Sequence, residues 1–120
     1  MSLSYPDINL FINGKWRPGN SKKWSNVVNP ATEEIVGKFA VAETIDLDES
    51  LEAADAAFKS WKKVAPFARY KMMRSAAELL RQRADEIARI MTIEQGKPIN
   101  ESRGEIGYGA SFVELSLIHI

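Results

Sequence analysis

Residues 70–91, YKMMRSAAELLRQRADEIARIM, carry the clearest structural signal in this chain of 120 residues. Apolar residues recur there at alternating steps of three and four, the spacing of one face of an α-helix. These residues are Tyr70, Met73, Ala77, Leu80, Ala84, Ile87 and Met91. A second row, Met72, Ala76 and Leu79, makes the face wider than the seam of a coiled coil. The pattern predicts a helix that packs into a core larger than a two-stranded zipper.

This helix has recognisable ends. Pro66 suits the first turn, where the N–H that proline lacks has no helical partner. Gly96 can take the left-handed conformation past the last turn, and Pro98 cannot continue a helix. We therefore predict one continuous helix from Pro66 to about Gln95. Two i,i+4 ion pairs are expected on its polar face, Arg74 with Glu78 and Asp85 with Arg89.

Another helix and several strands precede it. Asp46-Leu47-Asp48-Glu49 matches a capping box with Asp46 as N-cap, which predicts a helix over residues 46–63. Its apolar row is Leu47, Leu51, Ala54, Phe58 and Trp61. Asn13-Gly14 predicts a two-residue hairpin turn, and strands are expected over residues 24–28 and 34–41.

A final helix is expected to begin near Pro98 or near Ser102, where SRGE (102–105) matches a second capping box. Ile106, Ala110, Val113 and Leu117 continue at helical spacing. The three glycines at 104, 107 and 109 each cost a helix roughly 1 kcal/mol relative to alanine. This cost suggests that another segment, not evident in this chain, approaches the helix backbone closely.

Composition narrows the possible functions. The 16 basic and 16 acidic residues balance, so no net field draws nucleic acid or an anionic membrane as a partner. The absence of cysteine excludes disulfides, thiolate metal sites and thiol catalysis within these residues. Residues 1–13 show no signal peptide, and no apolar run approaches membrane-spanning length, so a cytoplasmic protein is expected.

Few residues suggest chemistry on pattern alone. The cluster GEIGYG (104–109) has the wrong glycine order for a dinucleotide-binding loop, and no strand precedes it. His119 has no nucleophile or ligand cluster near it in the sequence. Glu94, near a helix end, is a candidate general base or cation ligand, although such a glutamate usually only caps or faces solvent. The residues by themselves indicate an α/β piece without an assigned function.

Five short strings, taken together and in this order, resemble the N-terminal part of NAD(P)-dependent aldehyde dehydrogenases, closest to the succinate-semialdehyde dehydrogenase branch. They are FINGKW (11–16), VNPATEE (28–34), AADAAF (53–58), EQGKP (94–98) and ESRGEI (101–106). The resemblance implies an α/β fold in which residues 1–114 form the N-terminal portion of a Rossmann-like NAD(P)-binding domain, incomplete on its own. Its hairpin, short strands and three or four helices would lie against a sheet encoded further along.

The resemblance also implies a function for the whole protein. This would be oxidation of an aldehyde, with succinate semialdehyde as the candidate, to its carboxylic acid with NAD or NADP as cofactor. The partners expected are a small aldehyde and further copies of the same protein. The family's catalytic cysteine, glutamate and asparagine and its phosphate-binding turn all lie beyond the residues matched here. This chain is therefore expected to be inactive alone and to contribute no catalytic or cofactor-binding residue.

Two groups of site residues can be carried over from the resemblance. Some members bind a monovalent cation through a strand carbonyl and an acidic side chain, which correspond here to Val27 or Val28 and to Glu94. Oxygen ligands suit such a hard cation. In addition, Glu105, Gly109 and Phe112 would face the substrate funnel, although structural packing is the alternative reading of all three.

The last six residues, LSLIHI (115–120), depart from the family pattern. They match the translation of a sequencing adapter, and we expect them to be a non-native tail. Two other interpretations of the chain remain open. One is a free-standing helical interaction module without catalytic activity, pairing through the stripe from Tyr70 to Met91. The other is a separately encoded piece that complements a partner chain carrying the cysteine.

Overall fold

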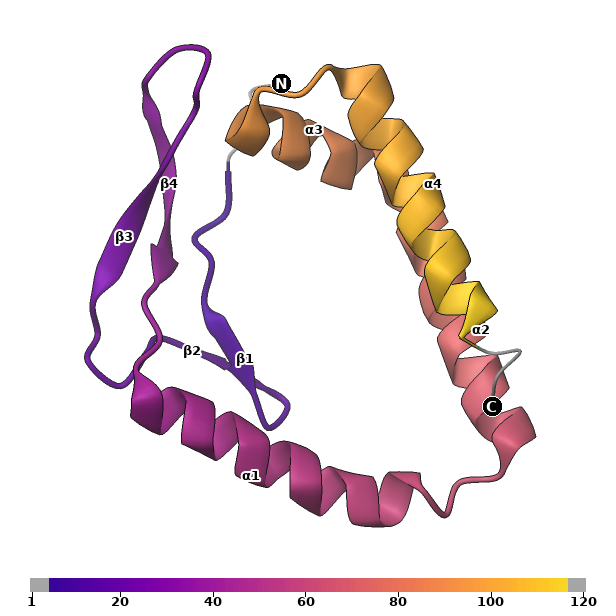
Figure 1. Cartoon of the computed structure of the whole chain (residues 1–120). Helices are drawn as coiled ribbons and strands as arrows, with labels where there is room; N and C mark the ends of the chain where they lie inside the picture. Colours follow the sequence, from indigo (N-terminus) through magenta and orange to yellow (C-terminus); the bar gives the residue numbers. More distant parts are fainter. Residues whose placement is uncertain (1–4, 117–120) are drawn as a thin grey trace. The chain divides into compact units, whose positions relative to one another are not determined.

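The computed structural model describes residues 5–116, which form four short strands and four helices (Figure 1). The strands are β1 (Leu10–Ile12), β2 (Lys15–Arg17), β3 (Trp24–Val28) and β4 (Ile35–Ala40). The helices are α1 (Thr44–Trp61), α2 (Pro66–Gln82), α3 (Ala84–Gln95) and α4 (Ile99–Leu115). The expected α/β composition is confirmed. Within residues 5–116, no helix has both the length and the apolar character needed to cross a membrane. Leu117 and His119 lie outside the described residues.

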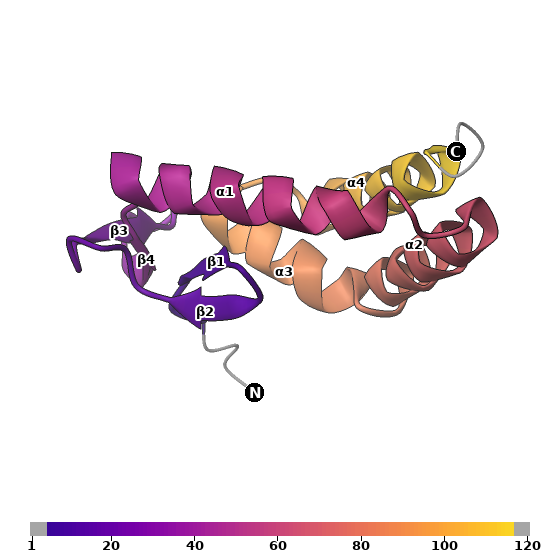
Figure 2. The same ribbon diagram turned by 90° about the horizontal axis from the view of Figure 1, so that it is seen from below.

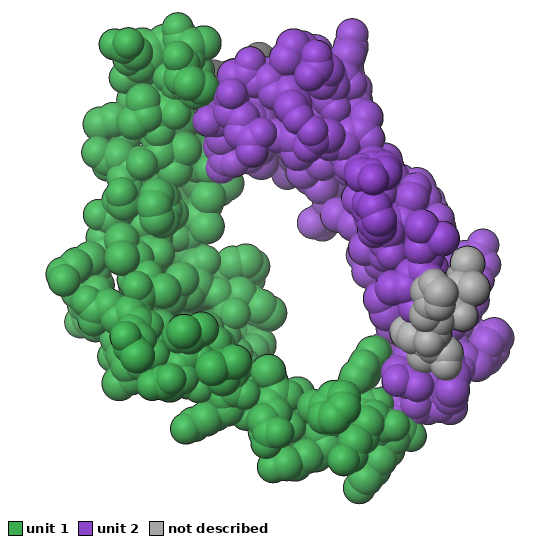
Figure 3. All heavy atoms as spheres, in the orientation of Figure 1, with its two compact units in different colours: residues 1–63 green, residues 64–120 purple. Residues whose placement is uncertain are grey.

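The chain divides into two compact units, Met1–Lys63 and Val64–Ile120, coloured separately in Figure 3. The first unit contains the described strands and α1, and the second contains α2, α3 and α4. The candidate residues of the substrate funnel belong to the second unit. The candidate cation ligands are divided between the two.

In the first unit, the predicted hairpin forms as the sequence indicates. Asn13 and Gly14 have φ values of 51° and 75°, the positive values that a two-residue turn of this kind needs. Phe11 lies opposite Trp16 across β1 and β2, with ring centroids 4.8 Å apart. β3 and β4 form a second antiparallel pair, whose register shifts between Val27 and Val28. Figure 2 shows the β1–β2 hairpin beside α1.

The start of α1 differs from the prediction. The N-cap is Glu43, and Asp46 is the third residue of the first turn rather than the cap. Its carboxylate accepts the Glu43 N–H at 2.9 Å, the Asn20 N–H at 3.1 Å and Arg17 Nη1 at 2.8 Å. Arg17 of β2 and Asn20 of the following loop bind this carboxylate within the first turn of α1, where Asp46 is only 1% exposed. The same region requires a glycine at position 19, because a Cβ there would lie 2.1 Å from the Val41 carbonyl oxygen.

The long helix predicted between Pro66 and Gln95 is two helices. α2 ends and α3 begins at Arg83, whose φ of −97° and ψ of 10° change the chain direction. The break lets both helices pack against α4. Arg81 of α2 makes a two-pronged bond to Glu114 at 2.8 and 2.7 Å, and Asp85 of α3 accepts Arg103 Nε at 2.7 Å. The expected partner of Asp85, Arg89, is thus replaced by a residue of α4.

The predicted apolar stripe does form the inner face of α2 and α3. Ala77 of the stripe is fully buried, as are Ala88 of α3, which was not among the predicted stripe residues, and Ala110 of α4, so small side chains let the helices approach closely. The other members of the stripe are partly buried, whereas the second row, Met72, Ala76 and Leu79, is exposed. The wide face predicted from the sequence is therefore covered on one side only within the described chain.

α4 begins after Pro98, which confirms the earlier of the two expected starts. Ser102 is not a cap: it lies inside the helix, fully buried, with its Oγ 3.0 Å from Thr92 Oγ1 of α3. At the end of α3, Gly96 takes a left-handed φ of 70°, as predicted. Gly96, Lys97 and Pro98 therefore form a short turn that places α4 against α3.

Candidate functional site

The candidate funnel residues share one exposed face of α4. Glu105, Gly109 and Phe112 follow one another at steps of four and three, and all three are exposed. The adjoining face, through Ile106 and Ala110, is buried against α2 and α3. Packing within the unit therefore fixes the rotation of α4 about its own axis, and it leaves the three candidate residues exposed.

This face is open and carries an aromatic pair. A Cβ added at Gly104, Gly107 or Gly109 would meet no atom within 4 Å outside its own helix. Tyr108 and Phe112 contact each other edge to face, with ring centroids 4.6 Å apart and planes at 80°. Both rings stay more than half exposed. The open surface and rings suit an apolar group or another chain segment lying along the helix.

An ion pair defines one end of the face. Lys97, in the turn before α4, bonds through Nζ to Glu105 Oε1. The Lys97 side chain is 26% exposed and that of Glu105 is 49% exposed. The charge of Glu105 is thus balanced by a lysine eight residues earlier. This pair was not predicted from the sequence, because no helical spacing rule connects a turn residue to the second turn of a helix.

The candidate cation ligands have suitable chemistry at each position. The register shift in the β3–β4 ladder falls at Val27 and Val28, and such irregularities locally disrupt the hydrogen bonds of strand carbonyls. Glu94, partly buried, lies in the last turn of α3. The two valines belong to the first unit and Glu94 to the second. Elsewhere in residues 5–116 no group of three or more His, Cys, Asp or Glu could hold a metal ion.

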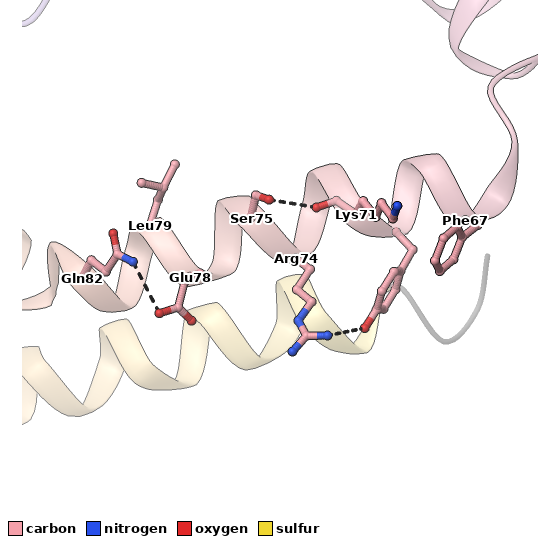
Figure 4. A pocket seen from close by; sticks show the side chains of 8 residues that line it. Phe67, Lys71, Arg74, Ser75, Glu78, Leu79 and Gln82 are labelled. Atoms are coloured by element: carbon pink, nitrogen blue, oxygen red, sulfur yellow. Dashed lines mark hydrogen bonds between the residues drawn. The ribbon is translucent and has the colours of Figure 1, made fainter.

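A shallow pocket on α2 was not predicted (Figure 4). It is lined by Phe67, Tyr70, Lys71, Arg74, Ser75, Glu78, Leu79 and Gln82. Arg74 Nη1 donates to the Tyr70 hydroxyl at 3.0 Å, and Lys71 lies over the Phe67 ring. The polar groups bond mainly within the same helix, so the pocket has the chemistry of a solvated helix surface. It contains no paired acid and base.

The comparisons with known proteins identify the family. The model of the aldehyde dehydrogenase family matches residues 16–119. The chain belongs to this family. Glutarate-semialdehyde dehydrogenase of Pseudomonas putida is 39% identical over 87% of this chain and 22% of its own length. Malonate-semialdehyde dehydrogenase 1 of Shouchella clausii is 38% identical over 91% of this chain and 22% of its own length.

Solved structures of aldehyde dehydrogenases have the same fold over this region. The NAD-dependent aldehyde dehydrogenase of Sinorhizobium meliloti superposes with a TM-score of 0.88 at 30% identity, over 93% of this chain and 23% of that one. The succinate-semialdehyde dehydrogenase of Burkholderia pseudomallei gives 0.87 at 34% identity, over 89% and 22%. The chain therefore has an N-terminal part of the aldehyde dehydrogenase fold and spans about a fifth of the length of these relatives.

The glycine cluster of this aldehyde dehydrogenase chain does not form a dinucleotide-binding loop. Pyrophosphate binding in such folds uses a glycine-rich turn between a strand and a helix N-terminus. The glycine cluster at 104–109 lies within α4, where the backbone N–H groups are engaged in the helix. This geometry rules out the cluster as a phosphate cradle, in agreement with the sequence analysis.

Proposed function

We propose that residues 1–114 form the N-terminal portion of the NAD(P)-binding domain of an aldehyde dehydrogenase. We further propose that the whole protein oxidises a semialdehyde, with succinate semialdehyde as the candidate, to the carboxylic acid with NAD or NADP. The observation that carries the proposal is the family match over residues 16–119, which comes with curated relatives that are semialdehyde dehydrogenases. The exposed face of α4 supports it, because Glu105, Gly109 and Phe112 lie together as a channel wall requires.

Catalysis needs residues that this chain lacks. Oxidation through a thiohemiacetal requires a thiolate nucleophile, and the 120 residues contain no cysteine. What the chain supplies is a wall for the aldehyde and a support for the remainder of the domain. Activity is accordingly expected of the whole protein and not of these residues alone.

Calorimetry tests the proposal that NAD or NADP is bound by residues outside this 120-residue chain. Titration of NAD or NADP into the 120-residue chain should give no heat of binding, because α4 places its glycines within a helix. The whole protein should bind one of the two cofactors and reduce it in the presence of succinate semialdehyde. Micromolar binding to the 120-residue chain would contradict the assignment.

A monovalent cation site is the second element of the proposal. The carbonyl of Val27 or Val28 and the carboxylate of Glu94 would provide oxygen ligands for K⁺ or Na⁺. Glu94→Ala in the whole protein should lower the response of activity or thermal stability to added K⁺ or Na⁺. Glu101→Ala removes a carboxylate from the first turn of α4 and serves as the control. An unchanged cation response in Glu94→Ala would remove the site from the proposal.

We also propose that residues 115–120 are a non-native tail. Their sequence, LSLIHI, supports this through its match to translated adapter sequence. Sequencing the source DNA across the codons for residues 113–120 tests the proposal. A reading frame that leaves LSLIHI out is expected, and the same six codons in an independent preparation of the gene would contradict it.

A further inference from the structure

We propose that Lys97 is a positioning residue that neutralises Glu105, so that the exposed face of α4 accepts an aldehyde carrying a carboxylate. This inference rests on the proposed function, since it takes Glu105 to line the aldehyde channel. It goes further by giving a specificity role to a residue in the turn between α3 and α4.

The geometry of the turn aims Lys97 at α4. Gly96 reverses the chain with its left-handed φ of 70°, and Pro98 starts the next helix with φ fixed near −55°. Between them, Lys97 is held so that its Nζ reaches Glu105 Oε1 in the second turn of α4. The backbone of this turn therefore places Lys97 directly before α4, and the ion pair joins the turn to the helix.

Burial makes this pair different from an ordinary surface ion pair. With only 26% of its side chain exposed, Lys97 is partly removed from water, so its charge is screened less than that of a solvated lysine. Other cations near α4 are already engaged: Arg103 bonds to Asp85, and Arg81 bonds to Glu114. Lys97 is therefore the cation that the structure places on the Glu105 carboxylate.

The ion pair affects which substrates the exposed face of α4 can accept, because it changes the charge of that face. An uncompensated Glu105 would repel the carboxylate of a semialdehyde passing Gly109 and Phe112, whereas an uncharged aldehyde would be unaffected. With Lys97 in place, the face presents a neutral pair beside open backbone and the Tyr108 and Phe112 rings. Loss of the lysine should therefore raise KM for an aldehyde that carries a carboxylate, and should leave KM for an uncharged aldehyde of equal length unchanged.

The experiment compares succinate semialdehyde with butanal in the whole protein. Lys97→Met, which keeps the length of the side chain and removes its charge, should raise KM for succinate semialdehyde about tenfold. Its KM for butanal should stay within about twofold, and kcat should be unchanged for both. Lys97→Arg should retain the wild-type KM values, because it restores the cation.

The double variant Lys97→Met/Glu105→Gln separates charge from structure. It should return KM for succinate semialdehyde to near the wild-type value, since the repelling carboxylate is gone. Glu101→Gln, which removes another acid from α4, should leave both KM values unchanged.

The outcomes separate this inference from the proposed function. If the whole protein oxidises both aldehydes and Lys97→Met shifts both KM values alike, the proposed function stands and the role of Lys97 is overturned. Failure of Glu105→Gln to rescue would also overturn it. If the wild-type protein oxidises neither aldehyde, the proposed function fails and the inference falls with it.

Discussion

Asp46 joins three segments of the first unit through hydrogen bonds to its carboxylate. It is buried and charged, which is costly unless hydrogen bonds compensate. The N–H of Glu43 and then that of Asn20, together with the Arg17 guanidinium, lower the pKa of Asp46 despite the opposing effect of burial. Since the ionised form makes these bonds, they connect β2, the loop at Gly19 and the start of α1 through one carboxylate.

The stability provided by Asp46 should depend on pH. Its pKa is lower in the folded chain than the value of about 3.9 typical of an unfolded aspartate. The stabilisation is therefore complete above that value and is lost as pH falls through the folded pKa. In the whole protein, Asp46→Asn should lower Tm at pH 7, and the difference from wild type should shrink as pH falls below about 4.

Thermal melts followed by circular dichroism between pH 7 and pH 3 provide the measurement. Asp48→Asn removes an exposed carboxylate from the same helix turn and should change Tm little at any pH. A Tm difference for Asp46→Asn that stays constant down to pH 3 would show that the carboxylate charge is not what stabilises the junction.

Single residues also show where local rules succeed. The Asn13-Gly14 turn and the left-handed Gly96 follow from backbone preferences that belong to those residues, and both were predicted correctly. Asp46 was placed on the right helix but at the wrong position in its cap. Glu43 and Asp46 are both acidic and three residues apart, so either could be the N-cap on local sequence alone. The bonds of Asp46 to Arg17 and Asn20 favour the arrangement in which Glu43 is the cap.

At the scale of helices, the break at Arg83 shows what periodicity cannot reveal. The apolar stripe continues through the break without a change of step, and neither glycine nor proline marks it. The decisive contacts lie on α4, where Arg103 and Glu114 bond to Asp85 and Arg81. The same reasoning explains the site: the shared face of Glu105, Gly109 and Phe112 follows from helical spacing, whereas the bond to Lys97 depends on the turn.

Close packing of α2 against α4 should make Ala77 intolerant of larger side chains. Ala77 is fully buried, whereas its neighbour Ala76 is exposed. In the whole protein, Ala77→Leu should lower the free energy of unfolding by about 1–3 kcal/mol, because the added atoms force the helices apart. Denaturant unfolding of the whole protein and of this variant measures the loss. A change of less than about 0.5 kcal/mol, as expected for a surface substitution, would contradict the assigned orientation of α2.

At the scale of the whole molecule, both units carry apolar surface that the described chain does not cover. On α1, Leu47, Leu51 and Phe58 are each more than half exposed, although they form the predicted apolar row. On α2 the second row, including Met72 and Leu79, is about half exposed. These rows have the spacing of helices that pack on a larger body, which agrees with the chain spanning about a fifth of its relatives.

The uncovered rows predict the behaviour of the 120-residue chain in isolation. It should bind the dye ANS and unfold without a sharp transition, because exposed apolar rows favour loosely packed states. Replacing Leu47, Leu51 and Phe58 together by glutamine should lower the dye signal more than replacing the exposed acids Asp48, Glu52 and Asp55. A compact oligomer with a cooperative melt and no dye binding would instead favour the free-standing interaction module.

The turn at Gly96 has a consequence for the order of folding. The contacts it brings together, Thr92 with Ser102 and Lys97 with Glu105, join residues only ten and eight positions apart. Loops of this size close within about 10–100 ns, whereas the Arg17–Asp46 and Arg81–Glu114 bonds join residues 29 and 33 positions apart. We therefore expect the α3–α4 hairpin to form early in folding. The candidate channel wall would then exist before the unit that surrounds it, and could serve as a nucleus for later segments of the chain.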